Sequence, residues 1–208
     1  MPTSYYKSEN KDFTLLKGDC IELLNSFDFK FDMIFADPPY HLSNGGISVQ
    51  SGKMVSVNKG DWDKSNGYEE DYLFDKSWIF ACRNKLKSNG TIWISGTYHN
   101  IFSVARCLAE LGFKILNCIT WEKTNPPPNL SCKYFTHSAE YILWARKEQK
   151  VSHYFNYELM KIINGGTQMR DVLRKSTTSQ NVLCIWRNFK SKHNYLRTKR
   201  FRLLMNLL

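Results

Sequence analysis

The stretch Phe31-Asp-Met-Ile-Phe-Ala-Asp-Pro-Pro-Tyr40 is a short apolar run that ends in a rigid tetrapeptide. The run predicts a β-strand, and Asp37, Pro38, Pro39 and Tyr40 then lie in the loop behind it. Neither proline has a backbone N–H and both restrict φ, so the carbonyl groups of this loop project as acceptors with few donors beside them. Two acceptors next to an aromatic face fit a flat ring that carries an amino group, such as adenine or cytosine. The same residues also occur in ordinary turns, so the neighbouring elements decide between the two interpretations.

Strand and helix patterns alternate on both sides of this run. Strands are predicted over residues 13–17, 91–95, 114–121 and 140–145, and helices over residues 21–26, 68–86 and 101–111. Residues 41–67 predict a long polar loop, and residues 122–136 predict a second loop with three consecutive prolines. The alternation predicts an α/β fold with a mainly parallel sheet, whose functional loops lie at the carboxyl ends of its strands. Asp37 and Ser95-Gly96 both fall at such ends.

Length and composition are those of about one globular domain. The chain has 208 residues, of which 42% are hydrophobic, enough for a single core. It has no apolar run of about 18 residues and no apolar signal region at its start, so we expect a cytoplasmic protein rather than a membrane or secreted one. The six cysteines are scattered, without a C-x-x-C pair or a His/Cys cluster at zinc spacing. Neither disulfides nor a metal site are therefore expected.

The formal net charge of +10 favours a polyanionic partner such as nucleic acid, because basic side chains that bind phosphates release condensed counterions. From Val172 onward the chain has nine basic residues and no acidic one, so most of the excess charge lies there. Basic tails are also common as solvated segments. Direct contact of this tail with DNA and simple solvation both remain open.

The Asp37-Pro-Pro-Tyr40 tetrapeptide after an apolar strand resembles motif IV of the amino-methylating DNA methyltransferases, which use S-adenosylmethionine (AdoMet) and modify adenine N6 or cytosine N4. The resemblance implies that Asp37, Pro38, Pro39 and Tyr40 form the catalytic loop, with Asp37 also bordering the cofactor. Gly18-Asp19-Cys20 resembles the element before motif IV in the permuted β-group, which implies that Asp19 and Cys20 bind AdoMet. The implied fold is a Rossmann-like three-layer α/β sandwich.

Further segments match the family in its own order. Residues 91–99 resemble motifs V and VI, and residues 121–145 resemble motifs VII and VIII. An aromatic residue near motif VIII can face the extruded base, and Phe135 is the candidate, with a core position as its alternative. The matches extend over residues 13–172. We therefore expect a catalytic domain with recognition loops over residues 1–172 and a poorly ordered, divergent basic tail over residues 173–208.

The resemblance implies a site-specific adenine-N6 methyltransferase of a restriction-modification system that acts on double-stranded DNA, because the Asp form of motif IV is commoner among adenine enzymes. The base must leave the helix stack before its amino group can react. Tyr40 would stack on the base, while the Asp37 carboxylate and the Pro38 carbonyl would accept the amino hydrogens. Cytosine N4, a catalytically impaired DNA-binding remnant, and an RNA or protein methyltransferase are the alternatives.

The chain departs from the family in one respect, because it contains no Asp-Pro-Phe-x-Gly-x-Gly loop for AdoMet. Residues 191–204 resemble the preceding motif X without its prolines, as a truncated or frameshifted reading of a longer gene would produce. In the family's sheet the missing strand lies beside the Asp-Pro-Pro-Tyr strand. We therefore expect a sheet that is incomplete at the C-terminus with an unpaired edge, weak AdoMet binding, and a partner chain or further C-terminal segment that supplies the loop.

Overall fold

The computed structural model describes residues 4–9, 14–43, 45–50, 53–56, 58, 60–175 and 202–206. Its strands are β1 (Ser4–Lys7), β2 (Thr14–Leu16), β3 (Phe31–Asp37), β4 (Ile47–Gln50), β5 (Lys53–Ser56), β6 (Leu86–Gly96), β7 (Lys114–Lys123), β8 (Ala139–Arg146), β9 (Val172–Lys175) and β10 (Arg202–Asn206). Its helices are α1 (Cys20–Ser26), α2 (Tyr68–Lys85), α3 (Ile101–Glu110) and α4 (Tyr157–Ile163), with a short 3-10 helix, η1 (Asp61–Asp63), before α2. The alternating order of an α/β fold is confirmed.

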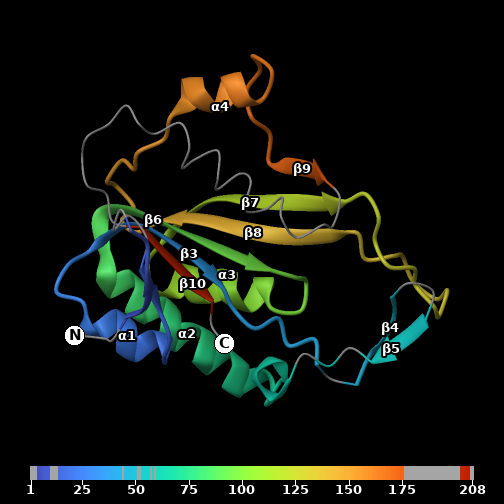
Figure 1. Cartoon of the computed structure of the whole chain (residues 1–208). Helices are drawn as coiled ribbons and strands as arrows, with labels where there is room; N and C mark the ends of the chain where they lie inside the picture. The colour runs from blue at the N-terminus through green and yellow to red at the C-terminus, as the bar shows by residue number, and fades with distance from the viewer. Residues whose placement is uncertain are drawn as a thin grey trace.

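Six of the described strands form one mixed sheet in the order β10-β3-β6-β8-β7-β9 (Figure 1). The pairs β10–β3, β3–β6 and β7–β9 are parallel, whereas β6–β8 and β7–β8 are antiparallel. Strands β7 and β8 are antiparallel because the loop between them contains no crossover helix that would return the chain to the other end of the sheet. The sheet is thus more mixed than the mainly parallel sheet that the sequence predicts.

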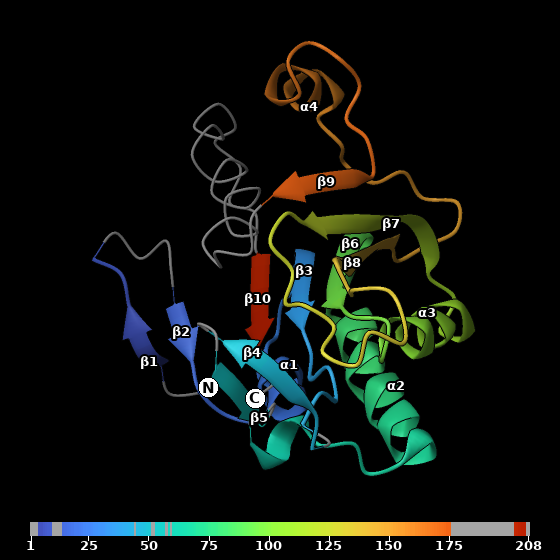
Figure 2. The same ribbon diagram turned by 90° about the vertical axis from the view of Figure 1, so that its right-hand side faces the viewer.

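Helices α1, α2 and α3 cover one face of the sheet (Figures 1 and 2). The alternate residues Ile92 and Ile94 of β6 point into this interface, and both are fully buried. Trp78 of α2 and Leu108 of α3 pack in the same core and are equally inaccessible to solvent. Truncating a buried aromatic side chain to alanine costs about 3–5 kcal/mol. Trp78 is therefore a main support of the packing between the helices and the sheet.

The other face of the sheet carries Trp93 and Trp144, which lie opposite each other in the β6–β8 pair. Their rings stack with centroids 4.7 Å apart and an interplanar angle of 19°. His153 and Phe155, from the segment before α4, pack against Trp144. Strands β6 and β8 are therefore covered on both faces. Helix α4 lies beyond the β7–β9 edge, away from the other helices (Figures 1 and 2).

Two expected boundaries are wrong. Residues 41–67 are not one irregular loop, because β4 and β5 pair as an antiparallel hairpin within them and η1 follows. Each of these strands has four residues, too few for an alternating pattern to stand out from a polar background. Strand β6 begins at Leu86 rather than at residue 91, because Leu86 already pairs with Phe31 of β3. The register shifts before the next pair, Met33 and Thr91, so Asn89-Gly90 lies in an irregularity of the strand, and regular pairing begins at the predicted residue 91.

Strand β10 fills the sheet position beside β3. It runs parallel to β3, with Arg202 opposite Met33 and Asn206 opposite Asp37. The expected unpaired edge beside β3 is therefore wrong, because residues of the predicted tail occupy it. Residues 176–201 lie outside the described residues, so the domain boundary after residue 172 stays a prediction. The described residues include no helix long and apolar enough to span a membrane and no group of three or more metal-ligating side chains.

Candidate active site

The carboxyl ends of β3 and β6 place Asp37 and Ser95 side by side. The two strands are parallel neighbours, with Ala36 opposite Ile94, so their ends lie at the same edge of the sheet. Ser95 Oγ donates a hydrogen bond of 2.5 Å to Asp37 Oδ1. The sequence predicts both residues at strand ends, and the structure brings them into contact.

Asp37 Oδ1 also accepts a hydrogen bond of 2.7 Å from the Tyr40 hydroxyl group. Both donors use the same carboxylate oxygen, and together they fix the orientation of the Asp37 side chain. Within the described residues, no hydrogen bond reaches the second oxygen, Oδ2. Because each carboxylate oxygen can accept about two hydrogen bonds, Oδ2 can accept a donor beyond those of the described residues.

Tyr40 is held as a neutral donor. Burial and the adjacent negative charge of Asp37 raise the pKa of Tyr40 well above its usual value. The phenol group therefore keeps its proton at physiological pH. A protonated phenol can donate to Asp37, and this bond keeps the ring beside the carboxylate.

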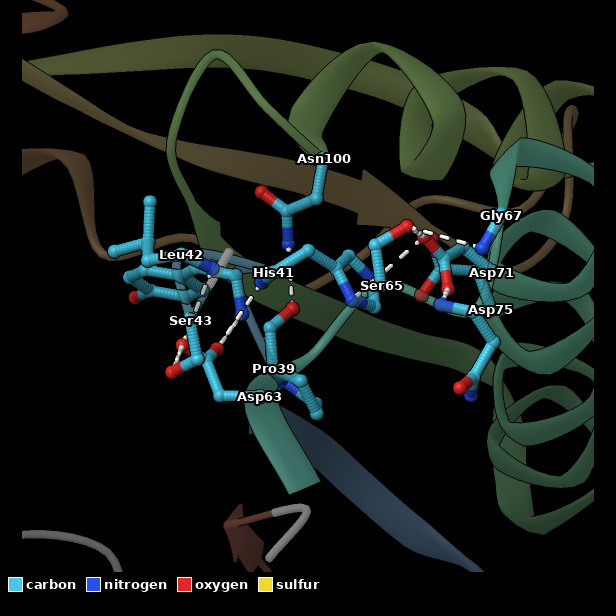
Figure 3. A network of polar contacts seen from close by, with 12 residues as sticks. Pro39, His41, Leu42, Ser43, Asp63, Ser65, Gly67, Asp71, Asp75 and Asn100 are labelled. Atoms are coloured by element: carbon cyan, nitrogen blue, oxygen red, sulfur yellow. Dashed lines mark hydrogen bonds and ion pairs between the residues drawn. The ribbon is translucent and has the colours of Figure 1, made fainter. Parts of the chain in front are cut away.

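The two proline carbonyl groups of the loop differ in their partners. Asn100 Nδ2 donates to the Pro39 carbonyl oxygen over 3.1 Å, and Asn100 Oδ1 accepts from the Thr97 N–H over 3.0 Å. Asn100 is only 2% exposed, so this contact is a buried tie between the loop and the start of α3 (Figure 3). No described residue donates to the Pro38 carbonyl. Among the described residues, the Pro38 carbonyl and Asp37 Oδ2 are thus two acceptors without protein donors.

Asp63, which sequence reasoning missed, holds the segment that follows the prolines. Asp63 Oδ1 accepts from the N–H groups of Tyr40 (2.9 Å) and His41 (3.1 Å), and Oδ2 accepts from the Leu42 N–H (3.1 Å) and the Ser43 hydroxyl (2.9 Å). Figure 3 shows the carboxylate of Asp63 pointing at this segment. Asp63 lies in the polar stretch before α2, and backbone donors leave no mark on a side-chain pattern. No sequence signal therefore identifies it.

Phe135 lies in the loop between β7 and β8 and is 95% exposed. The alternative of a core position is therefore wrong. In the same loop, His137 stacks on Tyr98, which follows β6, with ring centroids 4.5 Å apart and an interplanar angle of 19°. Tyr134 packs against the His137 ring with centroids 5.5 Å apart. These contacts tie the loop to the β6 end of the sheet and leave the ring of Phe135 open to a ligand.

Asp19 and Cys20 lie at the start of α1. Asp19 Oδ1 caps the helix by accepting from the N–H groups of Ile21 (2.9 Å) and Glu22 (3.0 Å), which explains why the helix begins there. Asp19 is exposed, and no described hydrogen bond uses its Oδ2. Burial raises the pKa of the Cys20 thiol to about 11. Cys20 is therefore a neutral thiol, and it packs against the core.

Known proteins resemble this chain over most of its length. The N6_N4_Mtase family, described as DNA methylase, matches residues 31–202. Type II methyltransferase M2.MboI of Moraxella bovis is 51% identical over 190 residues, which cover 91% of this chain and 68% of that protein. Type II methyltransferase M2.DpnII of Streptococcus pneumoniae is 55% identical over 180 residues, which cover 86% of this chain and 67% of that protein. The chain spans about two thirds of the length of these relatives.

Solved structures share the fold. The cytosine-N4-specific PvuII DNA methyltransferase matches with a TM-score of 0.63 at 17% identity, covering 86% of this chain and 61% of that chain. A putative DNA modification methylase from Thermus thermophilus, solved as a complex with S-adenosyl-L-methionine, matches with a TM-score of 0.51 at 19% identity, covering 76% of this chain and 64% of that chain. At these identities the likeness concerns the fold alone.

Proposed function

Because the chain belongs to the N6_N4_Mtase family of DNA methylases, we propose that it transfers a methyl group from AdoMet to the N6 amino group of adenine in double-stranded DNA. One observation carries the proposal: Asp37 Oδ2 and the Pro38 carbonyl are two acceptors, adjacent in the chain, without donors among the described residues. An exocyclic amino group brings two N–H donors. The pair of acceptors matches that group in number and in chemistry.

The amino group of adenine needs help, because its lone pair is delocalised into the ring. When Asp37 and Pro38 accept hydrogen bonds from its two N–H groups, the nitrogen moves toward a tetrahedral geometry and its lone pair becomes available for attack. Tyr40 and Ser95 contribute by holding Asp37 Oδ1, which keeps Oδ2 directed at the substrate. Orientation of this kind is the main catalytic effect when a transfer is direct and in line.

The exposed carboxylate of Asp19 fits the proposed cofactor, because its Oδ1 is used by the helix cap while its Oδ2 has no described donor. Asp19 would accept from the adenine amino group of AdoMet, with Cys20 beside it, and Asp37 would border the methyl end. When bound, AdoMet supplies an electrophilic methyl group. The glycine-rich AdoMet loop, which this sequence lacks, would come from a further segment or a partner chain.

The target base must be extruded from the duplex, at a cost of a few kcal/mol. Tyr40 would offset this cost by stacking on the base, which contributes about 1–3 kcal/mol per base. Phe135 is the second aromatic residue proposed to contact the extruded base, because its ring is almost fully exposed on the loop between β7 and β8. The relatives are type II methyltransferases, so we place the activity in a restriction-modification system acting on DNA in the cytoplasm.

The test is methyl transfer from radioactive AdoMet to duplex DNA, followed by digestion of the DNA to nucleosides. Millimolar AdoMet is used, since we expect weak binding without the glycine-rich loop. We expect radioactive N6-methyldeoxyadenosine from the wild-type chain and from Asp61→Ala, whose side chain is exposed outside the site. Asp37→Ala should abolish the incorporation.

Each alternative gives a different result in the same assay. Detection of radioactive N4-methyldeoxycytidine would show that the target base is cytosine rather than adenine. Incorporation into RNA or protein, but not into DNA, would move the chain to another substrate class. DNA binding without any methylated product, even at millimolar AdoMet, would favour a catalytically impaired remnant.

A further inference from the structure

Asp63 is a buried carboxylate that is satisfied by hydrogen bonds rather than by an ion pair. Its side chain is 0% exposed, and among the described residues it forms no ion pair. A carboxylate in such a position is unfavourable unless hydrogen bonds replace the lost water. Four donors do so, and all of them come from the consecutive residues Tyr40 to Ser43. The Ser43 N–H also donates to the Asp63 carbonyl over 3.3 Å.

The backbone of this segment is shaped around the carboxylate. His41 has a φ of 56°, a left-handed conformation that is unfavourable for a residue with a Cβ atom. The turn at His41 directs successive N–H groups toward one point, which is how backbone nests bind anions. Here the bound anion is a side chain of the same protein. The hydrogen bonds to Asp63 stabilise a turn that His41 alone would not favour.

Tyr40 is consequently held at both ends. Its N–H donates to Asp63 and its hydroxyl group donates to Asp37. Pro38 and Pro39 lie between these two anchors, and the Pro39 carbonyl is tied in addition to Asn100. The direction of the Pro38 carbonyl and the position of the Tyr40 ring therefore both depend on Asp63.

We propose that Asp63 is the positioning residue that sets the geometry of the catalytic loop. The proposal rests on the proposed function, and it assigns Asp63 no contact with substrate or cofactor. Asp63 acts through the Tyr40 backbone. Asp63 also joins the two ends of the segment that carries β4 and β5, because Ser43 precedes this segment, Asp63 follows it and the two residues are hydrogen-bonded. A change at Asp63 should therefore move the two acceptors of the catalytic loop.

The test compares Asp63→Asn with Asp61→Asn. The asparagine side chain in the first variant keeps the size of the original but replaces one acceptor oxygen with an NH2 group that faces donors. Asp61 is the matched control, because it is an exposed aspartate two residues away that pairs with Lys64. Hydrogen exchange reports on the loop directly, and steady-state methyl transfer reports on its consequence.

For Asp63→Asn we expect amide exchange at residues 40–42 to become at least about tenfold faster, with amides of β3 and α2 unchanged. We expect kcat to fall about 10²-fold while KM for DNA stays within about threefold, because a misplaced loop impairs orientation rather than binding. Asp61→Asn should match the wild type in both measurements. Unchanged exchange at residues 40–42, or a rise in KM with unchanged kcat, would overturn the proposal.

Two further arms keep the result interpretable. If thermal denaturation shows that Asp63→Asn does not fold, Ser43→Ala removes the hydroxyl donor to Oδ2 and keeps the three backbone donors, and it should accelerate exchange at residues 40–42 to a smaller extent. No acceleration in Ser43→Ala would then count against the proposal. If the wild-type chain transfers no methyl group, the proposed function fails, whereas the exchange measurement still decides whether Asp63 holds the loop.

Discussion

Asp37 Oδ1 accepts two hydrogen bonds at once, from the hydroxyl groups of Tyr40 and Ser95. Either hydroxyl group alone can orient the Asp37 side chain, because both donate to the same oxygen. We therefore predict that Tyr40→Phe and Ser95→Ala each impair methyl transfer modestly, and that the double variant is impaired by more than the product of the two single effects. Tyr40→Phe keeps the aromatic ring, so stacking on the base is preserved.

The magnitude follows from the bond type. A hydrogen bond to a charged acceptor contributes about 1.5–3 kcal/mol, and about 1.4 kcal/mol of barrier corresponds to a tenfold change in rate. A single variant leaves one donor on Oδ1, so we expect a loss of about three- to tenfold in the rate of the chemical step. The double variant leaves none, and we expect a loss of at least about 300-fold, with a coupling energy of at least about 0.6 kcal/mol.

Single-turnover methyl transfer at saturating DNA measures the chemical step without product release. Ser77→Ala and Tyr157→Phe are matched controls, because both side chains lie on the surfaces of helices outside the site. Unfolding curves for all variants separate loss of fold from loss of orientation. Additive losses in the double variant, or a Ser95→Ala variant with the wild-type rate, would show that the hydroxyl groups do not share the orientation of Asp37.

Three further predictions concern stability, the cofactor and the base. Burial raises the pKa of Asp75 from 3.8 to about 6, so the stability linked to its proton is complete below about pH 4 and is lost as the pH rises through about 6. Asp75→Asn should therefore be more stable than the wild type by up to about 3 kcal/mol at about pH 7.5. Urea unfolding that shows the same difference in stability at about pH 4.5 would contradict this prediction. Asp19→Asn should keep the helix cap and lose AdoMet affinity in calorimetry, whereas Asp19→Ala should also lose about 1 kcal/mol of stability; equal AdoMet binding by Asp19→Asn and wild type would remove Asp19 from the cofactor site. Phe135→Ala should change stability by less than about 0.5 kcal/mol and weaken the fluorescence rise of 2-aminopurine at the target position, and an unchanged rise would exclude Phe135 from contact with the extruded base.

The elements that the sequence predicts correctly are those with strong local patterns. Strand β3 is a continuous apolar run and α3 carries Val104, Cys107 and Leu108 at helical spacing, and all three of these residues are buried. Such patterns depend on neighbours a few residues away, so one chain suffices to detect them. The β4–β5 hairpin lacks that signal, because its strands are short and lie in a polar stretch.

The site divides in the same way. The residues Asp37, Tyr40 and Ser95 were identifiable, because their side-chain types and their places at or just after the ends of strands carry the chemistry. Asn100 and Asp63 were not, because their bonds to the loop go mainly to backbone groups that lie 61 and 21–23 residues away. A backbone N–H or carbonyl group has the same chemical identity at nearly every position. Only the fold reveals which side chain it meets.

The hydrogen-bond donors in and around this loop bind partners other than the two acceptors Asp37 Oδ2 and the Pro38 carbonyl. The N–H groups of residues 40–42 turn to Asp63, the Asn100 amide turns to the Pro39 carbonyl, and the hydroxyl groups of Tyr40 and Ser95 turn to Asp37 Oδ1. Among the described residues, Asp37 Oδ2 and the Pro38 carbonyl are therefore two acceptors to which no group donates. A base with a carbonyl oxygen at the reacting position, as in guanine or thymine, would meet two lone-pair acceptors and lose the hydrogen bonds it made to water. Under the proposed function, this arrangement would favour bases that carry an amino group at the reacting position, and Asp63 would contribute to that selection through the loop backbone rather than by contact with the base.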